Sequence, residues 1–263
     1  MRFAPIDLSE FPPEREIGLR KIQRYSRFAV MLYRSDLWMH SHRMLWMIEE
    51  LAPTLKKHLP ELDIDKCRVL ALVHDDAEMI TGDIQAGHKA LMNKKQLARI
   101  DKDEEIAAKK LAAKYPKKIA GYSYEKLLLD ALYKNSLESH VVNYFDKLDA
   151  YCESLHEFWA GNISFIRSVL FYSRTIPLFG KKYPKLQSFF EDKTSPLTFI
   201  EDRLPSKTIF PRAYRRLIPH TKASIKKPTE FPVYDAWKRV VLERGGKEAL
   251  DWLIMQREYI MSK

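Results

Sequence analysis

The sequence contains little glycine and little cysteine, and it has no long apolar run. Only 8 of its 263 residues are glycine, and apolar residues recur at helical spacing, whereas alternating β-branched residues are rare. The two cysteines, Cys67 and Cys152, both fall inside predicted helices and are not spaced as a zinc motif. An apolar leader and an apolar span of about 18 residues are both lacking. We therefore predict an all-α, cytoplasmic protein without disulfides or membrane spans.

The segment from His74 to Asp83 carries the strongest chemical signal. It follows the apolar run 69–73, which is typical of a buried helix that leads into a cleft. On a continuing helix, His74, Asp75 and Glu78 would project to one side, because they are three and four residues apart. A cation could bind the His-Asp pair and leave Glu78 free to transfer protons. The alternative is a solvated acidic face with a core histidine, since two ligands fall short of a complete metal site.

Further ligands should then come from other helices. His40 lies on a predicted helix and faces inward with its apolar stripe, whereas His42 is predicted at the surface. Downstream, a third helix offers Asp146 and Asp149, and either could complete the set. Periodicity mildly favours Asp149 as the buried residue of the two.

These residues together resemble the HD-domain metal-dependent phosphohydrolases, and they are most similar to the bacterial 5'-deoxynucleotidase branch. The resemblance covers about residues 17–180. The family pattern His-Asp-x-x-Glu-x-x-x-Gly-Asp is matched without a gap by His74, Asp75, Glu78, Gly82 and Asp83. The family's third ligand helix, which ends in Gly-Asn, matches the stretch from Asp146 to Asn162 and so selects Asp146 over Asp149.

The resemblance implies a role for each of these residues. One divalent cation (Mn²⁺, Co²⁺, Fe²⁺, Mg²⁺ or Zn²⁺) would be bound by His40, His74, Asp75 and Asp146. Proton transfer would fall to Glu78, with Asp83 assisting. The nucleotide would be contacted by Arg27, Phe28 and Thr81, with Arg24-Tyr25 as a rival to the Arg27-Phe28 pair. Phe28 would stand where the family has a Trp that senses the sugar, which bears on the preference for deoxyribose.

The donor types suit hydrolysis of a phosphate ester. A bound cation lowers the pKa of its water from about 15.7 toward roughly 7 and offsets charge on phosphorus. We therefore expect a phosphohydrolase that removes phosphate from nucleoside 5'-monophosphates with a metal-activated water. One alternative is an HD hydrolase of another phosphate compound, such as a nucleoside triphosphate or a signalling nucleotide. The other is a non-catalytic nucleic-acid-binding protein.

The C-terminal third differs in composition from the rest. Eight of the 14 prolines fall between Pro177 and Pro232, and residues 203–227 hold eight Lys or Arg and no acid, within a net charge of +10. We predict an HD-type domain over 1–180, followed over 181–263 by a Pro-rich basic segment and closing helices at 234–243 and 247–261 that pack on the core. A basic surface is favoured over a nucleic-acid site for 203–227. The resemblance also implies a homodimer.

Overall fold

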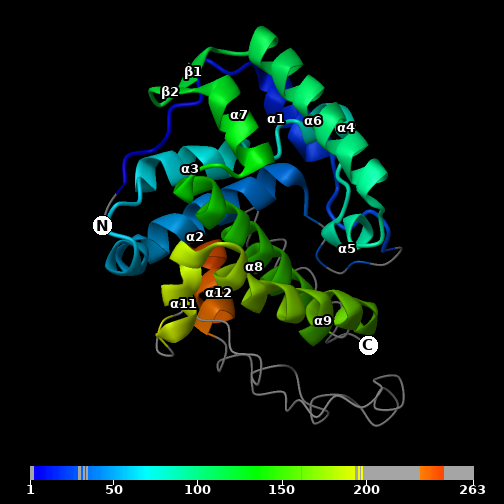
Figure 1. The fold of residues 1–263 in the computed structure, drawn as a ribbon, viewed down its shortest axis with the longest axis vertical. Helices are drawn as coiled ribbons and strands as arrows, with labels where there is room; N and C mark the ends of the chain where they lie inside the picture. The colour runs from blue at the N-terminus through cyan, green and yellow to red at the C-terminus, as the bar shows by residue number, and fades with distance from the viewer. Residues whose placement is uncertain are drawn as a thin grey trace. The chain divides into compact units, whose positions relative to one another are not determined.

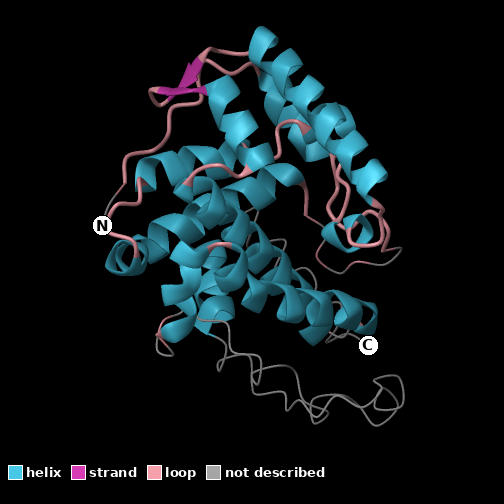
Figure 2. Cartoon of the chain, in the orientation of Figure 1, coloured by secondary structure: helices cyan, strands magenta, loops and turns pink. Residues whose placement is uncertain are grey.

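The computed structural model describes residues 3–28, 31, 33, 35–160, 162–192, 195, 197 and 232–245. Regular structure in these ranges is almost entirely helical, and their only sheet is a hairpin of two short strands (Figures 1 and 2). The prediction of an all-α protein is therefore confirmed. Among the described helices, none has the length and apolar character needed to cross a bilayer. The basic stretch 203–227 and the predicted helix 247–261 lie outside the described residues.

The chain divides into two compact units. The first consists of the described residues within Met1–Ala29, Arg34–Lys56 and Pro60–Asp146, and the second of those within Val30–Tyr33, Lys57–Leu59 and Lys147–Lys263. The predicted domain boundary near residue 180 stays a prediction. Cys67 in the first unit and Cys152 in the second are both buried, and neither takes part in a disulfide.

The first unit contains the helices that carry the predicted site. They are α1 (Pro13–Lys21), α2 (Leu37–His58), α3 (Ile64–Val73), α4 (Glu78–Thr81), α5 (Ala86–Lys89), α6 (Lys94–Lys114), α7 (Tyr124–Tyr133) and the first half of α8 (Leu137–Trp159). Local signals define where they begin. The side chain of Asp63 accepts from the backbone N–H of Lys66 and caps α3, and Asn93 and Gln96 form a reciprocal capping box on α6. Each cap satisfies backbone donors that a helix start leaves open.

A short hairpin precedes α7. The strands β1 (Lys118–Ile119) and β2 (Tyr122–Ser123) pair antiparallel through a turn at Ala120 and Gly121, whose φ values are 47° and 87°. Two positive φ angles match the right-handed twist of a two-residue hairpin, and glycine adopts such an angle without strain. The helix therefore begins one residue after Ser123, whose hydroxyl accepts from the backbone of Lys126.

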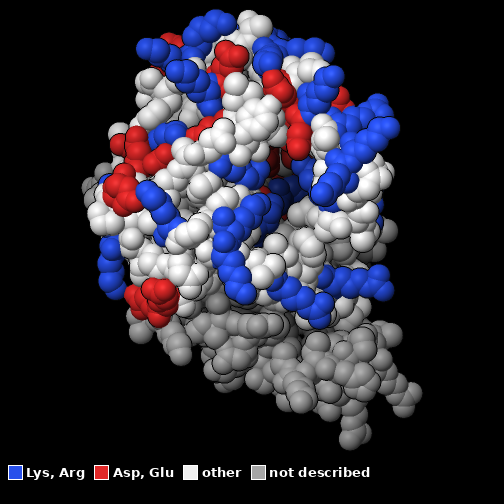
Figure 3. Space-filling model, in the orientation of Figure 1, with Lys and Arg blue, Asp and Glu red and all other residues white. Residues whose placement is uncertain are grey.

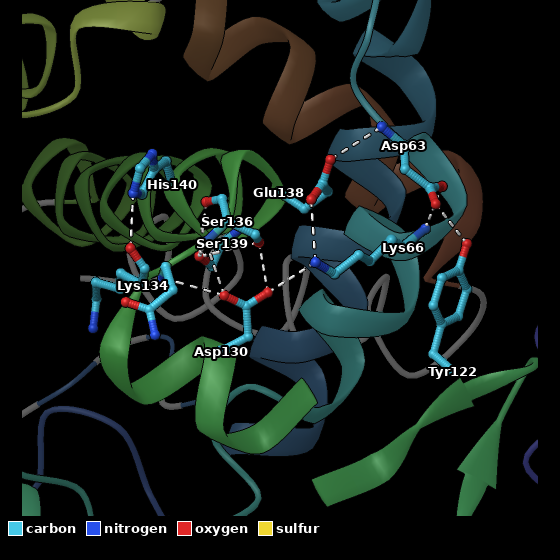
Figure 4. A network of polar contacts seen from close by, with 10 residues as sticks. Asp63, Lys66, Tyr122, Asp130, Lys134, Ser136, Glu138, Ser139 and His140 are labelled. Carbon is cyan, nitrogen blue, oxygen red and sulfur yellow. Dashed lines mark hydrogen bonds and ion pairs between the residues drawn. The ribbon is translucent and has the colours of Figure 1, made fainter. Parts of the chain in front are cut away.

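A polar network joins α3, α7 and the start of α8 (Figure 4). Nζ of Lys66 lies 2.9 Å from Oδ2 of Asp130 and 3.2 Å from Oε2 of Glu138. Ser136 donates to Asp130 from its hydroxyl at 2.5 Å and from its backbone N–H at 3.0 Å. These acidic groups have donors close by, so the network holds the first turn of α8 in place without help from a ligand.

The second unit is built on the second half of α8. It adds the 3₁₀ turns Ile163–Phe165, Ile176–Leu178 and Pro184–Gln187 and the helices α9 (Ile166–Thr175), α10 (Phe179–Lys182), α11 (Ser188–Glu191) and α12 (Pro232–Arg244). Helix α12 spans the predicted helix 234–243. Its fully buried Trp237 donates from Nε1 to Oδ1 of Asp149 at 2.6 Å, and the hydroxyl of Tyr234 lies 2.8 Å from Nδ1 of His156. Two polar contacts and a buried indole thus anchor α12 on α8.

Candidate active site

Helix α2 brings His40 into the interior of the first unit. Asp36 precedes the helix and accepts the backbone N–H of Met39 with its side chain at 2.8 Å, which caps the first turn. His40 is 0% exposed, as are Met44 and Ile48 one and two turns later on the same face. The inward orientation that periodicity predicted for His40 is confirmed.

The His-Asp motif lies on a turn and not on the continuous helix that we expected. Helix α3 ends at Val73 and α4 begins at Glu78, and between them the backbone N–H of Asp76 bonds the carbonyl of Val73 at 3.0 Å. Bonds of this i to i−3 type wind the chain more tightly than an α-helix. Gly82, at φ 77°, ends α4. The tighter turn points successive side chains in separate directions.

Three potential ligand atoms converge in the first unit. One atom each from His40, His74 and Asp146 lies within 4.8 Å of the others. Asp75 lies beside them, because its Oδ2 is 3.5 Å from Nε2 of His40 and its Oδ1 is 3.2 Å from Nε2 of His74. Nε2 of His40 is also 3.5 Å from Oδ1 of Asp146. The structure thus brings together all four residues that we expected to bind a metal.

The protonation of His74 favours a cation among these atoms. Its Nδ1 is 2.8 Å from the carbonyl oxygen of Ala71, which can only accept, so Nδ1 carries the hydrogen. Burial lowers the pKa of His74, which keeps the imidazole neutral. Nε2 therefore presents a lone pair, and it is buried without a hydrogen-bond partner among the described residues. A lone pair directed at the Asp75 carboxylate is unfavourable unless a positive charge lies between them.

The two aspartates of α8 lie in different surroundings. Asp149 is 2% exposed and accepts from Trp237 in the second unit. Asp146, with a side chain 18% exposed, is the one beside His40. Periodicity was right that Asp149 is the more buried residue, and the family pattern selected the residue that lies at the imidazoles.

The charges of the cluster affect the pKa values of Glu78 and Asp83. Burial raises the pKa of Glu78 well above its usual value, and the carboxylates of Asp75 and Asp83 add to the rise. Oε2 of Glu78 is buried and has no hydrogen-bond partner in the described part of the chain. Burial also raises the pKa of Asp83, against the opposing effect of Arg24. A carboxyl group with a raised pKa holds its proton to a higher pH than usual, and such a group can act as a proton donor.

The arginine at the carboxylates is Arg24. Its guanidinium nitrogens lie 3.9 Å from Asp75 and 4.0 Å from Asp146, and the residue is 8% exposed. Arg27 is exposed, and its Nη2 lies 3.4 Å from Nε2 of His88. The structure therefore places the rival arginine, and not Arg27, at the cluster.

Phe28 and Thr81 are the two other residues expected to contact the nucleotide. Phe28 is half-buried and packs edge to face on Tyr25, with ring centroids 5.9 Å apart. Thr81 lies on α4, and its hydroxyl is 3.3 Å from the carbonyl of Ala77. Their contact with a nucleotide stays a prediction.

Our sequence reasoning missed the support behind the turn. Arg15 of α1 donates from Nε and Nη2 to the two carboxylate oxygens of Asp76, both at 2.8 Å, and from Nη2 to the carbonyl of Leu72 at 2.7 Å. The hydroxyl of Tyr124 donates to Asp76 at 2.7 Å, and burial raises the pKa of Tyr124, which keeps that proton in place. Arg15 lies between Glu14 and Glu16 in the sequence, so nothing local indicated that its partner would be the distant Asp76.

The chemistry of the donor set fits a divalent cation. Two imidazole nitrogens and one or two carboxylate oxygens suit an ion of the transition series, and they leave room for substrate and water in its coordination shell. Beside them stand Arg24 and the Glu78 carboxyl, whose pKa burial raises. The arrangement can therefore hold a cation, an anionic ligand and a proton at one place.

Comparisons with known proteins agree with this geometry. Residues 17–194, well over half of the chain, match the model of a family described as "5'-deoxynucleotidase YfbR-like". The chain is 31% identical over 134 residues to proteins named 5'-deoxynucleotidase from Yersinia pestis (strain Pestoides F) and Yersinia pseudotuberculosis serotype O:3 (strain YPIII). Each match covers 51% of this chain and 66% of the relative, which is just under two thirds of its length.

Two solved structures share the fold. One is a conserved hypothetical protein from Pyrococcus furiosus, with a TM-score of 0.52, 20% identity and coverage of 69% of this chain and 98% of that one. The other is a protein from Pyrococcus horikoshii, with a TM-score of 0.52, 21% identity and coverage of 68% and 96%. At such identities the likeness is one of fold alone.

Proposed function

This chain belongs to the YfbR-like 5'-deoxynucleotidase family, and from that premise we propose that it is a metal-dependent phosphohydrolase that removes phosphate from nucleoside 5'-monophosphates. One observation carries the proposal. The neutral imidazole of His74 directs the lone pair of its buried Nε2 toward the same small volume as His40, Asp146 and Asp75, where a cation would make these groups compatible.

The cation would be held by His40, His74 and Asp146, with Asp75 as the fourth ligand. When bound, a divalent cation supplies positive charge beside the phosphate and makes a coordinated water a stronger acid. The identity of the cation, among Mn²⁺, Co²⁺, Fe²⁺, Mg²⁺ and Zn²⁺, is part of the test below.

The residues around this centre would bind the phosphate and move protons. Arg24 lies against Asp75 and Asp146, so its guanidinium can contact a phosphate that occupies the centre. Glu78, whose pKa is raised, would donate a proton to the departing sugar oxygen, and Asp83 would take part in the same proton transfer. Such transfers contribute on the order of 10² to 10⁴ in rate.

The sugar and base would lie on the more exposed side of Arg24. Arg27 and Phe28 stand three and four residues further along the chain, and Thr81 follows Glu78 by three residues, about one turn of α4. We propose that Phe28 contacts the sugar and Arg27 the outer edge of the nucleotide. The Yersinia relatives are named 5'-deoxynucleotidases. Comparing the rates of this chain on a ribonucleotide and on the matching deoxyribonucleotide would measure its preference for the sugar.

Phosphate release from a panel of ribo- and deoxyribonucleoside mono- and triphosphates, with each of the five cations in turn, tests the proposal. We expect release from monophosphates that a chelator abolishes. His74→Ala should lose both activity and cation binding, measured by calorimetry, whereas Glu78→Gln should lose on the order of 10² to 10⁴ in kcat and still bind the cation. His140→Ala is the matched control, because His140 belongs to the network of Figure 4 and bonds the carbonyl of Lys134.

Two outcomes would contradict the proposal. Release that neither the chelator nor His74→Ala affects would remove the metal from the reaction. Release from triphosphates alone would leave the metal centre in place and overturn the monophosphate assignment.

A further inference from the structure

Arg27 and His88 bring two polar side chains together from segments far apart in the sequence. Nη2 of the exposed Arg27 lies 3.4 Å from Nε2 of His88 on α5, which is longer than a usual hydrogen bond. Within the described residues, the side chain of Arg27 has no ion pair, and this contact is its only hydrogen bond. Most of the N–H groups of the guanidinium are therefore not engaged by the chain itself.

Gln85 adds a third donor on the same side of α5. Its carbonyl accepts the backbone N–H of His88 at 2.8 Å, so the two residues are three apart in one helical turn and their side chains project to one side. Nε2 of Gln85 is buried, and the described part of the chain offers it no hydrogen-bond partner. A buried donor without an acceptor is unfavourable, so an acceptor atom of a bound molecule would stabilise this arrangement.

Both segments that carry these donors adjoin the proposed metal centre. Arg24, which lies at the carboxylates of the centre, precedes Arg27 by three residues in the same turn. On the other segment, Lys89 directly follows His88. Burial raises the pKa of Glu78, and the positive charge of Lys89 partly opposes that rise, so α5 lies near Glu78. A ligand bound at the centre can therefore extend to Arg27 and His88.

The charges of this region favour an anion with more than one negative group. On the face that Figure 3 shows, Lys and Arg side chains are spread widely among fewer Asp and Glu side chains, and the net charge of the chain is +10. Such a surface attracts polyanions. A guanidinium also matches phosphate in particular, because it can donate two parallel hydrogen bonds to two phosphate oxygens.

We propose that Arg27, His88 and Gln85, the second-phosphate site, bind a second phosphate group of the substrate, carried on the 3' oxygen of its sugar. The inference rests on the proposed function, in which the 5'-phosphate occupies the metal centre and Phe28 contacts the sugar. Phe28 directly follows Arg27, so a phosphate at Arg27 would lie beside the sugar. The 3' oxygen is the position that ribose and deoxyribose share.

The substrate class is therefore a nucleoside 3',5'-bisphosphate. Hydrolysis by water of the bond between the 5' oxygen and its phosphorus would give inorganic phosphate and a nucleoside 3'-phosphate. A nucleoside 5'-diphosphate does not fit this arrangement, because its second phosphate is bonded to the first and would lie at the centre instead of beside the sugar.

Steady-state hydrolysis of three nucleotides that share one base tests the proposal. They are the 5'-monophosphate, the 3',5'-bisphosphate and the 5'-diphosphate, each assayed with the cation that supports release. We expect kcat/KM for the bisphosphate to exceed that for the monophosphate by roughly tenfold or more, mainly through a lower KM, because the second phosphate binds equally in ground and transition states. Chromatography of the products identifies the nucleoside 3'-phosphate.

Variants then locate the second phosphate. Arg27→Gln and His88→Ala should each lower the ratio of kcat/KM for the bisphosphate to that for the monophosphate by roughly fivefold or more, and Gln85→Ala by about threefold. The ratio compares two substrates on one protein, so a loss of folded protein cancels. Arg99→Gln removes a matched charge at an exposed position of α6 and should leave the ratio unchanged.

Binding without turnover separates this inference from the proposed function. Calorimetry on cation-loaded Glu78→Gln should give a Kd for the bisphosphate that is roughly tenfold below that for the monophosphate. If the natural chain hydrolyses neither nucleotide but this difference in Kd persists and is lost in Arg27→Gln, the second-phosphate site stands and the proposed function fails.

Three results would overturn the second-phosphate site. The first is an equal Kd and an equal kcat/KM for the bisphosphate and the monophosphate, which leaves the proposed function intact where the monophosphate is hydrolysed. The second is a ratio that Arg27→Gln and His88→Ala do not change. The third is a diphosphate that is preferred over the bisphosphate, which would place the second phosphate at the metal centre.

Discussion

Asp75 and Asp76 are neighbours in the His74–Ala77 turn, yet their carboxylates lie in opposite surroundings. Asp76 is 1% exposed and accepts two bonds from Arg15 and one from Tyr124. Asp75 faces the imidazoles of His40 and His74, and the nearest cation, Arg24, stays 3.9 Å away. A carboxylate whose acceptor sites are filled stabilises the fold, whereas one that shares its space with other acceptors leaves a place for a cation.

The difference teaches how this turn combines rigidity with binding. The side that faces α1 and α7 is a satisfied ion pair, so the turn cannot easily rearrange. The side that faces His40 is thereby held in an arrangement that would be unfavourable without a ligand. The polar network of Figure 4 resembles the Asp76 side, since Asp130 and Glu138 have donors within the chain.

The largest expected effect is a difference in unfolding free energy between variants of Asp76 and Asp75. Asp76→Ala leaves Arg15 buried without its partner, and we expect the free energy of unfolding to fall by about 3–5 kcal/mol. Asp75→Ala should cost less than about 1 kcal/mol, because it relieves contacts between acceptors. Urea unfolding of the metal-free proteins measures both. Equal losses for the two variants would show that the two sides of the turn do not differ.

A variant of Asp75 should also lose activity, because Asp75 faces the proposed cation. Asp75→Asn should lower kcat/KM by at least about 100-fold, which corresponds to ~2.7 kcal/mol in the activation barrier. The reason is that even a residue that only supports a metal ligand lowers activity or metal affinity by about 10- to 100-fold when it is removed. The apparent affinity for the cation should fall with it. Phosphate release at saturating and limiting cation measures the change. An Asp75→Asn protein with unchanged release would remove Asp75 from the centre.

A smaller effect sharpens the comparison on the Asp76 side. Tyr124→Phe removes one buried bond to a charged acceptor, and we expect a loss of about 1.5–3 kcal/mol in unfolding free energy. Tyr122→Phe is the matched control, because its hydroxyl donates to Asp63 at an exposed position, where a bond contributes at most about 1 kcal/mol. Thermal and urea unfolding compare the pair, and an equal loss would contradict the importance of burial.

The smallest effect is a pH dependence. The raised pKa of Glu78 means that the folded, metal-free protein favours the protonated carboxyl. Its contribution to stability is fully present below the usual glutamate pKa of about 4.3 and is lost as the pH rises through the raised value. Unfolding free energy should therefore decline over that window, and Glu78→Gln should flatten the decline. A profile that Glu78→Gln leaves unchanged would place the effect on another group.

Local spacing was sufficient to predict part of the site. The inward face of His40 followed from the apolar stripe of α2, and the motif from His74 to Asp83 was visible because its members are adjacent in sequence. The choice between Asp146 and Asp149 was not accessible to periodicity, since burial alone does not say which neighbour a carboxylate meets. The same holds for Arg24 and Arg27, which are three residues apart in a segment without a regular period.

The sequence by itself determined the helical class, the starts of α3 and α6 through their caps, and the set of residue types that can bind a cation. These properties depend on neighbours within a few residues. Tertiary structure alone decided that Arg15 and Tyr124 donate hydrogen bonds to Asp76. It also decided that Trp237 donates to Asp149, and that Arg24 lies beside Asp75 and Asp146. Such partners are up to 122 residues apart, as Arg24 and Asp146 are, and their contacts arise only when helices pack against one another, because hydrogen bonds and ion pairs act over a few ångströms of space.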